Sequence, residues 1–480
     1  MEIKNLEPKI VWEIFDAITK VPRPSKKEEQ IRAWLVDFAK KNNIECHVDE
    51  TGNLLLRKPA TPGRENRETI VMQGHIDMVC EKNSNIVHDF EKDPIETMIV
   101  DGWVTANGTT LGADNGIGVA MGLAALTDDS FEHGPLEVLC TYDEETGMTG
   151  ANNIKEGFMT GKILINLDSE TENQIFIGCA GGLDTLATWK YQAVEAPKNL
   201  YYAKIHVSGL LGGHSGGDIH LGHANANKVL CRFLLSQPGI EIAKIDGGNL
   251  RNAIAREAYA IIGIPMSRKD QLVAELNQYV AVIEGEVGDI EKGFKMTIET
   301  VDAPETIIEP AVAKQVLMAV EGTPHGVLGM SRSMPGLVET STNLASVKQF
   351  PEQGEIQIAT SQRSSVESAK LDAGLQVETC FKLAGAEVVH RSSYPGWKPN
   401  IESPIMKVCQ QAYRDVFKAE PEITAIHAGL ETGLFLTKYP YMDMVSIGPT
   451  MEGVHSPDER LNIESVGRFY PYLKEILSRI

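Results

Sequence analysis

Three apolar runs, each ending in acidic residues or histidine, constrain the fold of this chain most. They are "ETIVMQGHIDMV", "PLEVLCTYDE" and "GKILINLDSE", and the small-residue segment "GIGVAMGLAALTD" lies between the first and the second. Apolar runs that alternate with helical segments are typical of a parallel-rich sheet covered on both faces. In such a sheet the carboxyl ends of the strands form the ligand crevice. We therefore expect the polar residues at these ends to converge.

The middle of the chain predicts a second domain inserted into the first. "LATWKYQAVEAPKNLYYAKIHVSG" alternates with period two, which indicates antiparallel strands, and amphipathic helical segments follow it. We therefore predict an α/β protein with two domains. A catalytic domain with a mixed, mostly parallel sheet flanked by helices comprises residues 1–185 and 396–480, and an α+β lid and dimerisation domain comprises residues 186–395.

The composition argues against several classes of function. The 480 residues include 45 basic and 66 acidic side chains, and the net charge of -21 argues against nucleic acid or an anionic membrane as a partner. No stretch approaches the ~20 apolar residues of a membrane span, and the N-terminus does not resemble a secretory signal. The seven cysteines form no CxxC pair, which predicts reduced thiols. We expect a cytoplasmic protein.

The polar residues at the predicted strand ends indicate a metal site. The candidate ligands are His75, Asp114, Glu145, Asp168 and His455. Nitrogen and oxygen donors without a thiolate favour zinc, manganese or cobalt in a hydrolytic centre. Their three carboxylates would leave a single divalent ion with a net negative site, whereas two ions leave about one positive charge, which a bound hydroxide would cancel. We therefore expect two divalent ions per subunit, with zinc favoured and cobalt or manganese suitable.

Two further acids have predicted roles beside these ligands. Glu144 precedes the candidate ligand Glu145 and is free to act as a general base. Asp77 follows His75 by two residues, so on a strand both side chains point to the same side. Asp77 is therefore expected to hold the other ring nitrogen of His75 and to fix its tautomer.

Five motifs resemble those of a known enzyme family. "GHIDMV", "LGADNGIG", "YDEETGMTGA", "NLDSE" and "GVHSPDE" are similar to motifs of the co-catalytic zinc peptidases, which include carboxypeptidase G and aminoacylase. The wording is most similar to that of the aminoacyl-histidine dipeptidases, and the resemblance spans nearly the whole chain. It implies that His75 and Asp168 hold one ion, that Glu145 and His455 hold the other, and that Asp114 bridges them and precedes a cis peptide bond.

The resemblance also implies a function and roles for lid residues. It predicts a metal-dependent dipeptidase, expected to be a homodimer, that acts on small peptides and prefers Xaa-His substrates such as carnosine. His214 in "LLGGHSGGD" matches a lid histidine and is expected to stabilise the oxyanion. Asn252 and Arg363 are expected to bind the substrate carboxylate. "HAGLETG" (427–433) resembles a late substrate loop without assigned roles for its residues.

Three alternatives remain open at this point. Residues 213–217 satisfy G-x-S-x-G, so Ser215 with Asp443 and His455 would form a serine hydrolase triad. A module that only stores metal or binds peptide is a second alternative, although the spare acid Glu144 argues against it. A related amidohydrolase acting on N-acyl amino acids or tripeptides is the third.

Overall fold

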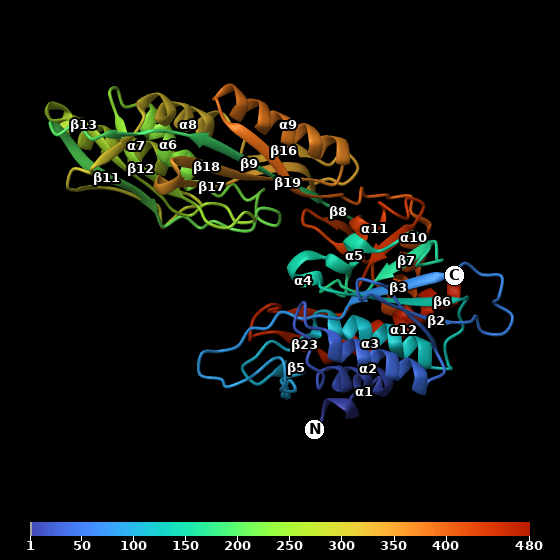
Figure 1. Cartoon of the computed structure of the whole chain (residues 1–480). Helices are drawn as coiled ribbons and strands as arrows, with labels where there is room; N and C mark the ends of the chain where they lie inside the picture. Colours follow the sequence, from blue (N-terminus) through green and yellow to red (C-terminus); the bar gives the residue numbers. More distant parts are fainter. Residues whose placement is uncertain (1) are drawn as a thin grey trace. The chain divides into compact units, whose positions relative to one another are not determined.

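The computed structural model describes residues 2–480 and divides them into two compact units (Figure 1). The first unit contains the chain up to Gly178 together with Trp397–Ala425 and Leu430–Ile480. The second unit contains Cys179–Gly396 and Ile426–Gly429. The second unit is therefore inserted into the first along the sequence.

The first unit is built on an eight-stranded mixed sheet. In spatial order its strands are β1 (Glu45–Val48), β2 (Leu54–Lys58), β6 (Leu136–Thr141), β3 (Ile70–His75), β7 (Ile163–Asn166), β21 (Asp443–Ser446), β8 (Gln174–Cys179) and β20 (Glu422–Ile426). The four central strands β6, β3, β7 and β21 run parallel, whereas β1, β2 and β8 pair antiparallel with their neighbours. Every residue of β3 and β6 is buried, which explains their continuous apolar sequences.

Helix α3 places small residues against this sheet. The helices of the first unit are η1 (Ile3–Asn5), α1 (Lys9–Ile18), α2 (Glu29–Lys41), α3 (Ala113–Thr127), α4 (Glu144–Gly147), α5 (Thr149–Asn153), α10 (Pro404–Phe417), α11 (Glu431–Phe435) and α12 (Ile463–Arg479). A Cβ atom at Gly118 would clash with the carbonyl oxygen of Leu167, and one at Gly122 would lie 3.0 Å from Val138. These glycines therefore allow the helix to approach the strands closely.

A four-stranded antiparallel sheet connects the end of the chain to an early segment. It consists of β22 (Met451–Glu452), β23 (Arg460–Asn462), β5 (Trp103–Ala106) and β4 (Thr97–Val100). The loop between β22 and β23 carries His455, and β5 precedes the start of α3 by a few residues. This pairing brings the last predicted metal ligand close to the segment that carries Asp114.

The second unit contains a nine-stranded antiparallel sheet. Its strands in spatial order are β14 (Lys295–Thr300), β11 (Leu200–Ser208), β13 (Ala258–Pro265), β12 (Glu241–Gly247), β17 (Val338–Phe350), β18 (Glu355–Ser364), β9 (Gly181–Lys190) and β19 (Glu387–Tyr394), with β16 (Gly326–Met330) paired to β17. β10 (Ala193–Glu195) and β15 (Thr306–Ile308) form a separate pair. With these two sheets, the predicted fold class of a mixed α/β unit with an inserted α+β unit is confirmed.

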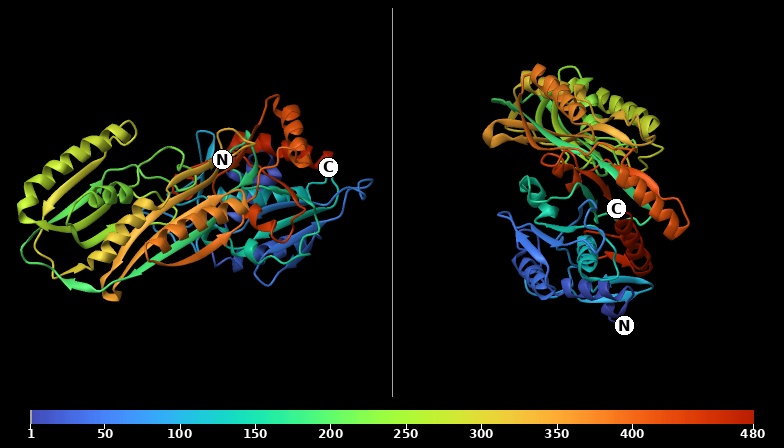
Figure 2. Two further views of the ribbon diagram at one scale, coloured as in Figure 1. Left: turned by 90° about the horizontal axis from the view of Figure 1, so that it is seen from above. Right: turned by 90° about the vertical axis from the view of Figure 1, so that its right-hand side faces the viewer.

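Four longer helices cover one face of the large sheet in the second unit, as Figures 1 and 2 show. They are α6 (Ala226–Leu235), α7 (Lys269–Val287), α8 (Pro310–Gly322) and α9 (Glu367–Leu383), and the short turns η2 (Met266–Arg268) and η3 (Pro351–Gln353) complete the unit. Within the described part of the chain, no helix has the length and apolar character needed to cross a membrane.

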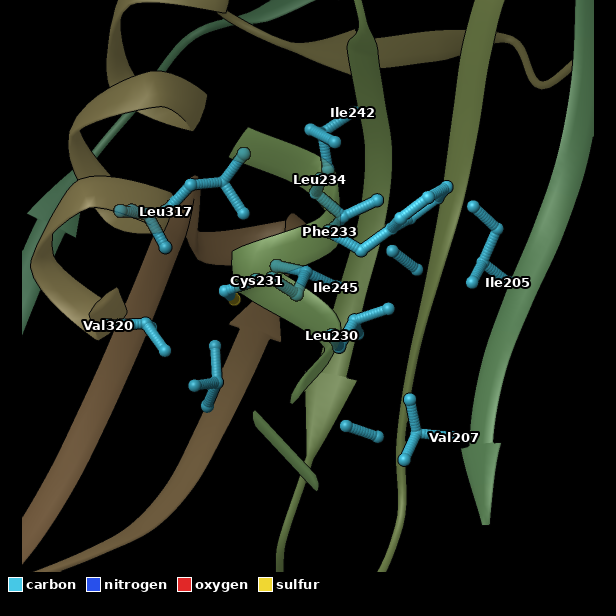
Figure 3. Close-up of a cluster of buried hydrophobic side chains, with 14 of the residues drawn as sticks. Ile205, Val207, Leu230, Cys231, Phe233, Leu234, Ile242, Ile245, Leu317 and Val320 are labelled. Carbon is cyan, nitrogen blue, oxygen red and sulfur yellow. The ribbon is translucent and has the colours of Figure 1, made fainter. Parts of the chain in front are cut away.

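The core of the second unit lies between these helices and the sheet (Figure 3). Side chains of α6 point into it, and β11, β12 and α8 supply the residues that surround them. The labelled members are Ile205, Val207, Leu230, Cys231, Phe233, Leu234, Ile242, Ile245, Leu317 and Val320. Each of these side chains is at most 3% exposed, so this part of the unit excludes water.

We expect Leu234→Ala to lower the free energy of unfolding by about 2–5 kcal/mol, because it leaves a cavity in this core. Leu234 is fully buried, whereas Leu383 at the end of α9 is 86% exposed. The matched control Leu383→Ala should change stability by less than about 0.5 kcal/mol. Urea unfolding measures both variants, and equal effects would contradict the assigned core.

Candidate active site

The predicted metal ligands come together within the first unit, and Asp114 lies between the two histidines. Oδ1 of Asp114 is 3.0 Å from Nε2 of His75, and Oδ2 is 3.1 Å from Nε2 of His455. Nε2 of His75 also lies 3.4 Å from Oδ1 of Asp168. Nε2 of His455 also lies 3.1 Å from Oε2 of Glu145. The site therefore has two halves that share one carboxylate.

The order of the strands explains why these side chains meet. His75 is the last residue of β3, which lies between β6 and β7 in the sheet. Asp168 follows β7 by two residues, and Glu145 lies in the short helix α4 after β6. The peptide bond between Asp114 and Asn115, at the start of α3, is cis, in agreement with the family resemblance.

The donor atoms fit divalent ions in both halves. Two ligands that share a zinc ion at ~2.0–2.1 Å lie ~3.3 Å apart in a tetrahedral site, which is close to the distances of 3.0–3.4 Å found here. Oδ1 of Asp168 and Oε1 of Glu145 are buried and have no hydrogen-bond donor among the described residues. A cation would satisfy both of these oxygens.

The histidines bind protons tightly in the absence of a cation. Hydrogen bonding to Asp114 and Glu145 raises the pKa of His455 to about 11. Burial opposes the charging of His75, but Asp168 and Asp114 outweigh it and raise the pKa of His75 well above its ordinary value. A metal ligand must be a neutral imidazole, so binding of a divalent ion at either histidine would release a proton.

The three consecutive acids after β6 have separate surroundings. Asp143 is buried, and its carboxylate accepts hydrogen bonds from the hydroxyls of Thr146 and Thr149. Glu145 contacts His455, as described above. Burial raises the pKa of Glu144 well above its ordinary value, and nearby acids including Glu431 add to this effect. A raised pKa suits a group that first accepts and then releases a proton.

Asp77 contacts both the histidine and the acidic turn. Its Oδ1 lies 3.3 Å from Nδ1 of His75 and accepts a hydrogen bond of 3.0 Å from the backbone N–H of Glu144. Its Oδ2 accepts hydrogen bonds from the backbone N–H of Glu145, at 3.2 Å, and from the hydroxyl of Ser25, at 2.8 Å. Asp77 therefore couples the position of His75 to that of the Glu144–Glu145 backbone.

Glu459 is a residue of the site that the sequence analysis did not identify. It is 2% exposed and follows His455 by four residues. Its carboxylate accepts hydrogen bonds from the backbone N–H groups of Leu111, Gly112, Ala113 and Asp114, at 2.7, 2.9, 2.7 and 3.2 Å. The loop that carries His455 thereby holds the turn that carries Asp114. The sequence did offer a signal for Glu459, because it is the last acid of the quoted motif "GVHSPDE".

Three predicted substrate residues belong to the second unit, where they lie around Ser215. Nε of Arg363 donates a hydrogen bond of 3.3 Å to Oγ of Ser215, and the backbone N–H of Ser215 donates one of 2.8 Å to the carbonyl of Asn252. Nδ1 of His214 accepts hydrogen bonds from the backbone N–H groups of Gly216 and Gly217. The neutral ring therefore carries its proton on Nε2, which leaves that nitrogen as a donor.

The proposed serine triad does not form. The carboxylate of Asp443 accepts hydrogen bonds from the hydroxyl of Ser403 and the backbone N–H of Ile405, at the start of α10. His455 faces Asp114 and Glu145. The serine hydrolase alternative is therefore not supported, because its histidine and acid have other partners.

The sequence and the fold match known peptidases. Residues 71–479 match the model of peptidase family M20/M25/M40. The chain is 42% identical to the cytosol non-specific dipeptidase of Escherichia coli (strain K12) over 482 residues, covering 100% of this chain and 99% of that protein. The crystal structure of aminoacylhistidine dipeptidase from Vibrio alginolyticus matches with a TM-score of 0.93 and 40% identity, covering 100% of this chain and 98% of the other. Aminopeptidase PepT from Bacillus cereus, 16% identical with a TM-score of 0.58 over 98% of both chains, shares the fold.

The chain belongs to peptidase family M20/M25/M40. The resemblance found in the motifs is thus confirmed, as is the prediction of an enzyme that hydrolyses peptide bonds. A module that only binds metal or peptide is not supported.

We expect Glu459→Gln to weaken the binding of divalent ions by about 10- to 100-fold, because an amide cannot accept all four backbone hydrogen bonds. Glu452→Gln is the matched control, since Glu452 lies in the same hairpin but forms an exposed ion pair with Arg460. Calorimetric titration of the metal-free protein measures both variants. Equal affinities of the two variants for divalent ions would contradict a role of Glu459 in supporting the metal site.

Proposed function

We propose that this protein is a dinuclear metallo-dipeptidase. The observation that carries the proposal is the position of Asp114, whose two oxygens face the Nε2 atoms of two different histidines. Each histidine has a second carboxylate beside it, so the residues provide two similar ligand sets with one shared member. Paired ions ~3.5–4 Å apart are a known arrangement for hydrolysis.

The charge of the site supports two ions. The carboxylates of Asp114, Glu145 and Asp168 lie together with neutral imidazoles as the other ligands, so one divalent ion would leave the ligand set negative. Burial already raises the pKa of Asp168 to about 7, which reflects the cost of charging it without a cation. We propose zinc as the resident metal, and cobalt or manganese also suit nitrogen and oxygen ligands.

Glu144 is the proposed general base. When bound, two divalent ions would lower the pKa of a water molecule and polarise the scissile carbonyl. Glu144 would take the proton from the attacking water and deliver it to the leaving amine. Asp77 would keep Glu144 and His75 in place through its contacts with both.

We assign substrate recognition to the second unit. Arg363 is 7% exposed, and its guanidinium contacts the hydroxyls of Ser215 and Tyr394, which leaves further N–H groups available for a carboxylate. Nε2 of His214 is the proposed donor to the oxyanion, and Asn252 is a proposed substrate contact. A fixed carboxylate-binding group would favour dipeptides, because it sets the distance from the scissile bond to the C-terminus.

The substrate class follows from the relatives rather than from the geometry. The two full-length relatives are named as a non-specific dipeptidase and an aminoacylhistidine dipeptidase. We propose dipeptides as substrates, with Xaa-His members such as carnosine among the preferred ones. We also propose a cytoplasmic homodimer.

Glu144→Ala is expected to bind both ions and to lose turnover by about 10²–10⁴-fold, because only proton transfer is removed. Metal analysis and steady-state kinetics on a Xaa-His dipeptide measure the two properties. Chelation should abolish the activity of the wild type, and a serine-directed reagent should leave it intact. Normal turnover in Glu144→Ala would exclude it as the base.

Arg363→Ala is expected to raise KM for dipeptides by about tenfold or more, since a charge-assisted contact with the substrate carboxylate contributes about 1.5–3 kcal/mol. The C-terminal amides of the same dipeptides lack this carboxylate, so the wild type and the variant should cleave them equally. Arg251→Ala is the control, because Arg251 is 64% exposed in its ion pair with Asp184. An unchanged KM for the free dipeptides would contradict the role of Arg363.

A further inference from the structure

Glu431 is a buried carboxyl group that the proposed mechanism does not use. It begins α11 in the segment "HAGLETG" and is 1% exposed. Its Oε2 accepts a hydrogen bond of 2.6 Å from Nε2 of Gln73 and one of 2.7 Å from the hydroxyl of Thr141. Burial raises the pKa of Glu431 to about 8. A carboxyl group at such a position needs a reason, because burial without a cation is costly.

A chain of hydrogen bonds connects Glu431 to the backbone of a proposed metal ligand. The backbone N–H of Asp168 donates to Oδ1 of Asn166 at 3.3 Å, and the hydroxyl of Ser446 donates to the same oxygen at 2.5 Å. Nδ2 of Asn166 donates to Oε1 of Gln73 at 2.6 Å. Nε2 of Gln73 then donates to Glu431, which completes the chain.

The backbone N–H of Asp168 is the first member of this hydrogen-bonded chain and determines the direction of the bonds from Asp168 to Glu431. A backbone N–H can only donate, so the oxygen of Asn166 must face Asp168 and its nitrogen must face Gln73. The oxygen of Gln73 must then face Asn166, and its nitrogen must face Glu431. Thr141 also directs its hydroxyl to Glu431. Two donors therefore point at one atom, Oε2 of Glu431, which accepts both hydrogen bonds.

The members of this chain lie just before the residues of the active site. Gln73 precedes His75 by two residues on β3, and Asn166 precedes Asp168 by two residues at the end of β7. Thr141 ends β6, and Ser446 ends β21. These four strands are neighbours in the sheet. The five side chains of the hydrogen-bonded chain are each at most 1% exposed; they are Gln73, Thr141, Asn166, Glu431 and Ser446. A polar network of this kind fixes the relative positions of the strand ends.

We propose that Glu431 is a positioning residue that terminates this hydrogen-bonded chain and thereby holds His75 and Asp168 in the geometry needed to bind their metal ion. The proposal rests on the two-metal function proposed above. Glu431 does not itself need to touch the substrate or the metal. Loss of its acceptor oxygen would leave the nitrogen of Gln73 only its longer hydrogen bond to the hydroxyl of Thr141, at 3.1 Å, and would leave that hydroxyl only the carbonyl of Gly74, at 3.4 Å. The strand ends would then rearrange to recover the lost hydrogen bonds.

The test is a calorimetric titration of the metal-free protein with zinc. The wild type is expected to show two binding steps. Glu431→Met removes the acceptor and should weaken one step by about 10- to 100-fold, with a fall in kcat on a dipeptide. Glu431→Gln retains an acceptor oxygen and should restore both the affinity and kcat. A role limited to general stability would not be rescued in this selective way.

Glu137→Met is the matched control for loss of a buried carboxylate. Glu137 lies on β6 and is 1% exposed, but it accepts hydrogen bonds from Arg57, Thr160 and Gly161 away from the chain. Its replacement should lower the thermal midpoint and leave zinc affinity unchanged. Thr141→Val removes one donor to Glu431 and one acceptor of Gln73 with little change of shape. It should weaken the same zinc step as Glu431→Met, to a smaller extent.

The outcomes separate this proposal from the proposed function. If the wild type binds two zinc ions and both Glu431→Met and Thr141→Val bind them equally well, the positioning role is overturned and the dinuclear site stands. If Glu431→Met does not fold, unchanged zinc affinity in Thr141→Val overturns the role. A wild type that binds no divalent ion overturns the proposed function together with this inference.

Discussion

The active site depends on the mutual repulsion of carboxylates that the fold brings together. Two like charges ~4 Å apart repel by about 4 kcal/mol at an effective dielectric constant of 20. Asp114, Glu145 and Asp168 meet at His75 and His455 within a few ångströms. Such a group is stable only when protons or cations neutralise it, and the paired geometry around Asp114 matches two cations. Protons on the histidines neutralise part of this charge in the metal-free chain, and metal ions would replace those protons.

Three buried acids hold these ligands in place through hydrogen bonds from neutral donors. Glu459 binds the turn of Asp114 through four backbone N–H groups. Asp77 accepts backbone hydrogen bonds from Glu144 and Glu145. Glu431 receives its hydrogen bonds from an amide and a hydroxyl. A lysine or arginine in any of these contacts would compete with the metal ions, whereas neutral donors position the ligands and leave their charge available.

Much of this arrangement could be predicted from residues near one another in the sequence. The apolar runs predicted the central strands, and the polar residues after them predicted the ligands, because the carboxyl ends of parallel strands meet at one edge. Glu459 and Glu431 were not identified, although both lie in motifs that were noticed. Their partners, the turn before α3 and Gln73, are more than 340 residues away in the sequence, and no local pattern reports a contact of that kind.

The sequence by itself determined the candidate metal ligands, the spare acid beside one of them, and the buried character of the strands that carry them. These properties follow from residue type and from the period of the apolar pattern, which are local. Only the tertiary structure decided which buried acids hold these residues in place and at what distances the carboxylates lie from the two histidines. Those features depend on the order of strands in the sheet and on the directions of individual hydrogen bonds, which exist only once distant segments have packed together.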